Sequence, residues 1–126
     1  MGDPTTPVLQ PQGRFSRRDR LGGQTDFQRV LRKGRRSQGP HLGLAVARTQ
    51  GAEKRIGLAI AKGVGNAPDR ARMRRLTREA FRAVRHTLPA GTDVVVFVRR
   101  PWPDADLASV LTELTSTLRQ LRLGGS

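Results

Sequence analysis

The residues with the clearest capacity for chemistry are arginines spaced along one predicted helix, residues 66–86. At about 100° per residue, they fall on a single arc with Arg75 just beyond it: Arg70, Arg74, Arg78, Arg82 and Arg85. An adjoining arc is apolar and suited to packing: Met73, Leu76, Ala80, Ala83 and Val84. Only Asp69 and Glu79 oppose the arginines, and like charges four residues apart repel by about 0.2–0.5 kcal/mol per pair. We therefore expect a phosphate-binding face, with an ordinary solvated surface as the alternative.

Side chains that support catalysis are few in this sequence. His41 begins a predicted strand and His86 ends a predicted helix, and neither stands at a recognisable spacing from a serine or aspartate partner. Asp104 and Asp106 form a candidate carboxylate pair, although carboxylates at a helix start more commonly cap the helix. The glycines of Gly63–Asn66 are typical of a tight turn, with phosphate binding at a helix N-terminus as the alternative. The residues predict no catalytic site and no metal site.

The chain as a whole is strongly basic. Its 126 residues include 24 Lys and Arg against 10 Asp and Glu, a formal net charge of +14, and all basic residues except Lys33, Lys54 and Lys62 are arginine. The planar guanidinium group binds phosphate through paired hydrogen bonds, so nucleic acid is the expected partner. An anionic membrane is the weaker alternative, because no apolar run approaches the roughly 18 residues of a spanning helix.

Length and composition predict one domain between two tails. Residues 1–13 are rich in Pro, Gly, Thr and Gln and have no apolar signal-peptide core, which predicts a disordered N-terminal tail on an intracellular, cytoplasmic protein. Residues 14–122 form a single predicted RNA-binding domain that begins with a basic arm, and residues 123–126 form a C-terminal tail. The absence of cysteine excludes disulfides, thiol catalysis and cysteine-ligated metal sites.

Three predicted helices position these side chains. The arginine helix begins at the N-cap Asn66, with an acidic partner three residues later. A short helix over residues 26–33 follows a capping box at Thr25–Gln28 and ends at Gly34. Asp104 is the predicted cap of the last helix, whose leucines share one side: Leu107, Leu111, Leu114, Leu118 and Leu121.

Three strands are predicted from the apolar pattern. Residues 41–48 and 55–62 alternate, and residues 50–53 are expected to join them as a hairpin loop, whereas residues 93–100 form a continuous apolar strand of the buried type. In the first two strands, the large aliphatic side chains share one face while glycine and alanine share the other. Such a small-residue face is equally consistent with a helix packed very close and with a groove open to a ligand.

The segment Lys62–Arg82 closely resembles the signature of the bacterial ribonuclease P protein component. In that family a turn of the type K-K-V-G-N-A is followed by R-N-R-x-K-R-x-x-R-E-x-F-R. The similarity extends upstream through Arg20-Leu21, Asp26–Val30 and Gly34, and downstream through Leu88–Asp93, the valine strand and Arg99-Arg100-Pro101. It covers residues 14–121.

The resemblance implies both a fold and a function. The implied fold is an α/β (α+β) two-layer sandwich in the order α-β-β-β-α-β-α, with an unusual left-handed β-α-β crossover that carries the arginine helix. The implied function is that of the protein subunit of a ribonucleoprotein endoribonuclease, in which the RNA subunit carries the Mg²⁺-dependent hydrolysis that removes the 5′ leader of precursor tRNA. The implied partners are this catalytic RNA and the leader, with no DNA and no membrane.

Carried over position by position, the resemblance identifies two sets of residues. Contacts with the catalytic RNA are expected from the basic helix and the turn before it: Lys62, Asn66, Arg70, Arg72, Arg74, Arg75 and Arg78. The leader is expected in a groove between the first helix and the sheet, lined by Arg20, Phe27, Leu31, Ala45 and Ala59. Phe27 is suited to stacking on leader bases and equally suited to a plain core position.

The sequence departs from the family pattern at four positions. Gly63 replaces the second lysine of the turn, Ala71 the signature asparagine, Leu76 a basic residue and Leu31 the second aromatic residue of the first helix. The change at Ala71 removes a hydrogen-bonding amide, and the change at Leu31 predicts a groove with less stacking.

Two other functions compete with this interpretation. A ribosomal or other structural RNA-binding protein of similar architecture would bind RNA without supporting cleavage. A small DNA-binding domain would place the arginine helix in a groove, but base reading there favours Asn or Gln beside the arginines, and the helix has neither after Asn66.

Overall fold

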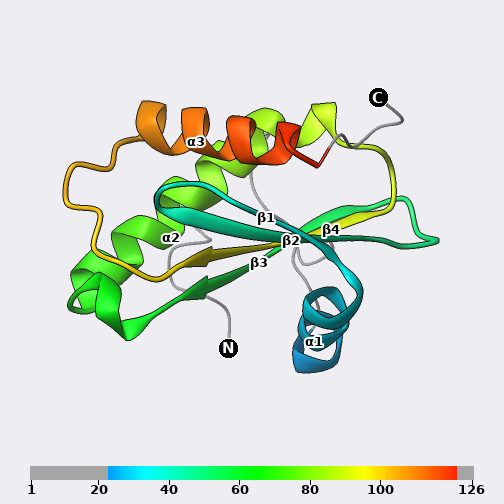
Figure 1. Ribbon diagram of the computed structural model, residues 1–126, viewed down its shortest axis with the longest axis horizontal. Coiled ribbons are helices and arrows are strands. Elements are labelled where there is room, and N and C mark those ends of the chain that lie inside the picture. Colours follow the sequence, from blue (N-terminus) through cyan, green and yellow to red (C-terminus); the bar gives the residue numbers. More distant parts are fainter. Residues whose placement is uncertain (1–22, 122–126) are drawn as a thin grey trace.

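A four-stranded sheet separates two helical layers in the computed structural model, which describes residues 23–121 (Figure 1). The elements in chain order are α1 (Gly23–Lys33), β1 (Arg35–Gln38), β2 (Leu42–Arg48), β3 (Lys54–Ile60), the short 3-10 helix η4 (Lys62–Val64), α2 (Ala67–Val84), the short 3-10 helix η5 (Arg85–Thr87), β4 (Thr92–Val98) and α3 (Leu107–Arg119). Helices α2 and α3 cover one face of the sheet, and α1 lies against the other (Figure 1). The predicted mixed order of helices and strands is confirmed.

The strand order is β1-β2-β4-β3. β4 is antiparallel to β2 and parallel to β3, and α2 forms the crossover between β3 and β4. The predicted hairpin between β2 and β3 is wrong, because β4 lies between them. β4 is buried almost throughout and gains a hydrogen-bonded neighbour on each edge in this position. The segment that joins β2 to β3 crosses the start of β4. There Thr49 N–H donates to Gly91 O at 2.7 Å, and Thr92 N–H donates to Glu53 O at 3.2 Å.

The bulky face of the sheet carries the main core. Large side chains of the strands pack there against α2 and α3, and the fully buried ones include Leu42, Leu44, Val94, Val96, Phe81, Met73 and Leu114. The buried arc of α2 differs from the predicted one, because Ala83 is exposed whereas Phe81, Thr77 and Arg78 are buried. Packing against both the sheet and α3 buries a wider part of the helix than one apolar arc.

Capping residues were predicted correctly for one helix of three. Asn66 caps α2, since its side chain accepts from Asp69 N–H at 3.0 Å and the Asp69 carboxylate accepts from Asn66 N–H at 3.2 Å. The Thr25 box is wrong, because α1 begins at Gly23 and Thr25 lies inside it. The cap of α3 is Asp106 rather than Asp104, and Leu107 consequently begins that helix 40% exposed.

No helix within residues 23–121 combines the length and the apolar character needed to cross a membrane.

Candidate nucleic-acid interface

The first part of the interface is the basic side of α2 and the turn that precedes it. Gly65 has φ of 152°, and a Cβ there would lie 2.3 Å from Asp69 Oδ2, so this position requires glycine for the capping box to form. Lys62 and Asn66 are exposed at this helix start, Arg70 is partly exposed in the first turn, and exposed Arg75 and partly exposed Arg74 lie farther along the helix. Positive charge thus continues from the turn along α2, an arrangement that attracts phosphate.

Two of the predicted RNA-binding arginines point elsewhere. Arg78 is only 6% exposed, so most of its side chain lies within the fold rather than on the surface. Arg72 donates a hydrogen bond to Ala105 O, in the loop before α3. The sequence pattern gave no sign of either position, because helical periodicity alone does not locate α3.

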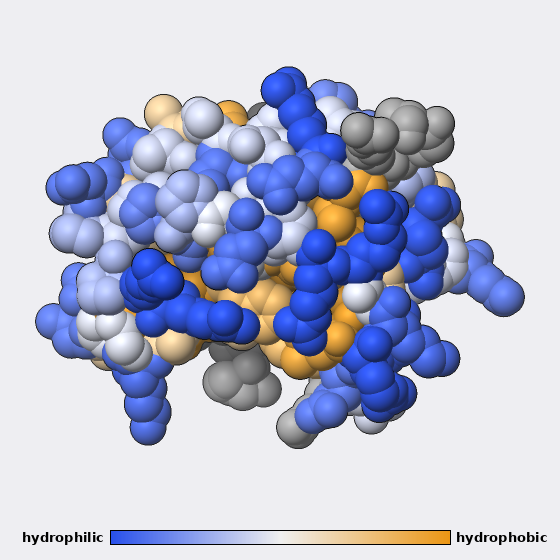
Figure 2. All heavy atoms as spheres, viewed as in Figure 1, coloured by the Kyte–Doolittle hydropathy of each residue, from blue (hydrophilic) through white to orange (hydrophobic). Residues whose placement is uncertain are grey.

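The second part of the interface is the small-residue face of the sheet, and α1 covers only some of it. Val30 of α1 is fully buried against Ala45 and Val95, with Ala47 beside them. Gly43 and Ala59 remain partly exposed farther along the strands. Both alternatives for this face are therefore realised, with a closely packed helix at one end and an open surface at the other. Figure 2 shows hydrophobic surface exposed in a strip across the middle of the view, bordered by strongly hydrophilic side chains.

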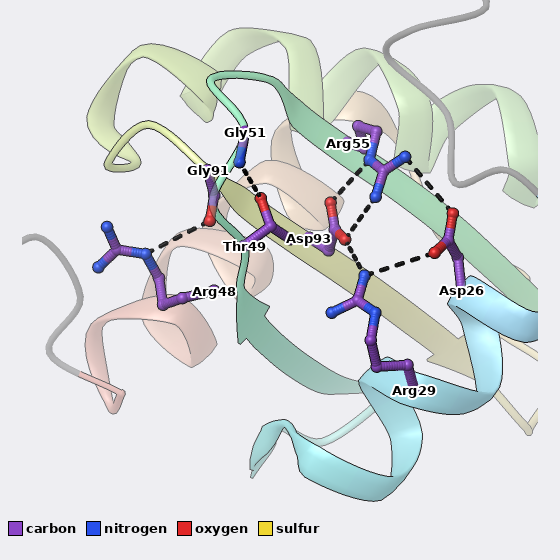
Figure 3. Close-up of polar contacts among 8 residues, drawn as sticks. All are labelled: Asp26, Arg29, Arg48, Thr49, Gly51, Arg55, Gly91 and Asp93. Atoms are coloured by element: carbon purple, nitrogen blue, oxygen red, sulfur yellow. Dashed lines mark hydrogen bonds and ion pairs between the residues drawn. The ribbon is translucent and has the colours of Figure 1, made fainter.

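An ionic cluster fixes α1 to the sheet (Figure 3). Asp93 of β4 is 1% exposed, and its carboxylate accepts two hydrogen bonds from Arg55 of β3, at 2.9 and 2.8 Å, and one from Arg29 of α1 at 2.5 Å. Asp26 of α1 also lies 3.5 Å from Arg55 and 3.7 Å from Arg29. The hydrogen bond to Asp93 raises the pKa of Arg55, which outweighs the opposite effect of partial burial. Two carboxylates thus balance two guanidinium groups.

The predicted groove residues occupy different depths. Phe27 and Leu31 of α1 are partly buried against the small-residue cluster, and Ala59 is partly exposed. Ala45 is fully buried beneath α1, so it supports the helix rather than presenting an accessible surface. Arg20 lies outside the described residues.

Sequence reasoning missed several residues at the open end of this face. A surface pocket there is lined by Arg36, Ser37, Gln38, Gly43, Leu44, Phe97 and Arg99. Phe97 lies in a strand that was predicted to be buried on both faces, so its partial exposure was not expected. β1 was not identified from its residues because Arg35–Gln38 has no apolar alternation, so Arg36 was not predicted to lie on the sheet. The alternation Asp93, Val95, Phe97 was the available signal, since it places Phe97 on the small-residue face.

The candidate catalytic groups have structural surroundings. The His41 ring stacks on Trp102, with centroids 4.0 Å apart, and its Nδ1 lies 2.9 Å from Glu113 Oε1. Asp106 caps α3, and the Ser109 backbone N–H that it accepts from holds its pKa below the ordinary value. Within residues 23–121, no three His, Asp or Glu side chains are grouped so as to hold a metal ion. We assign no metal ligand to these residues.

Comparison with known proteins gives one consistent similarity. The family model described as Ribonuclease P matches residues 15–122. The ribonuclease P protein component of Chloroflexus aurantiacus is 37% identical over 102 residues, which covers 80% of this chain and 76% of that protein. The corresponding protein of Syntrophobacter fumaroxidans is 36% identical over 93 residues, covering 74% and 78%. The solved RNase P protein from Thermotoga maritima aligns with a TM-score of 0.72 at 25% identity, covering 80% of this chain and 96% of that one.

Proposed function

The chain belongs to the ribonuclease P protein family, and from this premise we propose that it binds the catalytic RNA of ribonuclease P and the 5′ leader of precursor tRNA. Its role is to support endonucleolytic removal of the leader in the cytoplasm. The phosphodiester hydrolysis, with its Mg²⁺, belongs to the RNA subunit in this proposal. The chain's own residues bind and orient the two RNAs.

The observation that carries the proposal is the separation of two basic surfaces by the sheet. Helix α2 lies on the side of the bulky core, and α1 lies on the small-residue side of the sheet (Figure 1). A protein arranged in this way can hold two RNA segments at once without competition between them. A protein that binds a single RNA would need only the α2 surface and not the partly open surface on the other side of the sheet.

The α2 surface is suited to the structured catalytic RNA. Exposed Arg75 and partly exposed Arg70 and Arg74 present positive charge on a rigid helix, and exposed Lys62 adds charge in the turn before it. Contacts of this kind neutralise phosphates and release counterions, so affinity falls steeply with salt. The capping box at Asn66 fixes the direction in which these side chains project.

The groove is suited to a single-stranded leader. Glycine and alanine on the strands allow a close approach of an extended RNA backbone, and Phe27 offers an aromatic side chain at the edge of α1. Stacking of this type is tolerant of base sequence. This tolerance fits a subunit that must accept the leaders of many different tRNA precursors.

Substrate binding by the reconstituted complex tests the proposal. We would measure the affinity of the catalytic RNA, with and without this protein, for precursor tRNA carrying a leader of several nucleotides and for mature tRNA. The proposal predicts that the protein tightens binding of the precursor by roughly tenfold or more and leaves mature tRNA nearly unchanged, since about 1–3 kcal/mol is expected for each stacked base. Equal effects on the two tRNAs would contradict a leader-binding role.

A further inference from the structure

Phe97 is a large aromatic residue on a face otherwise built from small ones. The sheet register places it directly between Gly43 of β2 and Ala59 of β3. It packs at the margin of the small cluster formed with Val30 and Val95 and is only partly buried. The residues beside the ring on the two neighbouring strands are therefore small, and they leave space for a ligand on this face of the sheet.

Glycine at position 43 is what keeps this ring accessible. A Cβ built on Gly43 would lie 3.5 Å from Phe97 Cδ2, in ordinary van der Waals contact. A longer side chain on the same face would extend over or beside the ring. Two surface pockets meet here, and both include Gly43, Phe97 and Arg99 in their linings.

Two guanidinium groups from different elements lie over the ring in cation-π contacts. The Arg36 guanidinium of β1 lies 5.8 Å from the ring centroid, and the Arg99 guanidinium, which follows β4, lies 5.3 Å from it. Arg36 is also held in place by a hydrogen bond to Leu31 O at 2.9 Å. Both arginines are exposed. An aromatic ring beneath two exposed cations combines the two features that bind one unpaired nucleotide: a surface for its base, once the guanidinium groups turn from the ring, and charge for its phosphates.

We propose that Phe97 is a stacking platform for one unpaired base of the leader and that Arg36 and Arg99 bind the phosphates on either side of that base. This inference rests on the proposed function and adds a specificity-determining residue to it. Phe97 lies in the same cluster as Leu31, so it supplies an aromatic ring close to the α1 position where an aromatic residue is lacking. In this chain the stacking surface comes from the sheet as well as from α1.

The test combines a protein substitution with removal of single bases from the leader. Precursor tRNAs carrying one abasic site at each leader position in turn are bound to the reconstituted complex of catalytic RNA and protein. With the wild-type protein, we expect one position at which base removal weakens binding by about tenfold. With Phe97→Leu, which keeps an apolar side chain without a ring, the intact leader should bind about tenfold more weakly and base removal at that position should cost nothing further.

Three variants complete the experiment. Phe97→Tyr keeps the ring and should restore the sensitivity to base removal. Leu107→Ala, an exposed apolar residue on α3, is the matched control and should leave leader binding unchanged. Arg99→Gln should keep the sensitivity to base removal. It should also lower the slope of log affinity for the leader against log salt by about one, the change expected for the loss of one phosphate contact. The fold of each variant is checked by its thermal transition.

The outcomes separate the inference from the proposed function. If Phe97→Leu retains the same abasic profile as the wild type, the platform is overturned while the leader-binding role stands. If the wild-type complex binds precursor and mature tRNA equally, the leader-binding role fails and the platform fails with it.

Discussion

At the residue scale, the buried carboxylate of Asp93 links α1 to the sheet beside the groove. It is almost fully buried and joins guanidinium groups from two elements, Arg29 of α1 and Arg55 of β3. The apolar contact between α1 and the sheet is small and centres on Val30. The carboxylate therefore acts together with the packing of Val30 to hold α1 over the sheet.

Replacing Asp93 by Asn should destabilise the protein by about 2 kcal/mol. The substitution leaves two guanidinium groups without their buried partner, and their partial exposure reduces the cost below that of a fully buried pair. Urea unfolding measures the change. Asp104→Asn, at an exposed position, is the control and should lie within about 0.5 kcal/mol of wild type. Equal stability of the two variants would show that the ionic cluster does not hold α1.

A pH dependence is expected at Asp106. Its pKa is lowered in the folded state, first by the Ser109 backbone N–H and then by the Ser109 hydroxyl. A carboxyl of this kind stabilises the fold fully above its unfolded pKa, near 3.8, and that contribution is lost as the pH falls through the lower folded value. Asp106→Ala should thus lower the melting temperature at neutral pH, and its difference from wild type should shrink as the pH falls below 3.8. A difference that stays constant with pH would contradict the role of the charged cap.

At the element scale, local chemistry predicted more than long-range pairing did. The cap of α2, the two faces of β2 and β3, and the apolar strand β4 follow from residue types and periodicity. The place of β4 between β2 and β3 does not, because strand order depends on which edges are left to pair. Strand β1 also lacks a local signal. Its four polar and basic residues form a strand only because the edge of β2 is available to them.

The same limit applies to the candidate site. The pattern of arginines predicted a basic side of α2, and the glycine and alanine alternation predicted a face suited either to a close helix or to a groove. Which arginine is covered could not be read from the helix alone, since Arg78 is buried by packing around α2 rather than by its own spacing. The contribution of Phe97 likewise required the cross-strand register.

Exposed arginines of α2 and α3 should differ in their effect on RNA binding. Arg75→Gln removes an exposed charge and should weaken binding of the catalytic RNA while lowering the slope of log affinity against log salt by about one. A salt titration of the binding constant measures both. Arg119→Gln, an exposed arginine at the end of α3, is the charge-matched control. The assignment of α2 would be wrong if the two variants gave the same slope.

At the scale of the whole molecule, the sheet separates the two surfaces that we propose bind RNA. Helices α2 and α3 enclose the main core on one side, and α1 with the open small-residue surface occupies the other (Figure 1). A net charge of +14 on 126 residues favours association with polyanions on either side. The neutral ionic cluster around Asp93 lies beneath this charge and fixes the geometry of one side. Under the proposed function, this separation lets one small domain contact a large RNA and a substrate strand together.

Cleavage of a precursor tRNA at low magnesium concentration is the most direct test of the central claim. The matching catalytic RNA, this protein, and the two together are each given the same substrate, and 5′-leader removal is followed with time. The account predicts cleavage stimulated in the mixture, with none by the protein alone. Tight RNA binding without stimulation would contradict it and would favour a structural RNA-binding protein, and cleavage by the protein alone would place the chemistry in this chain.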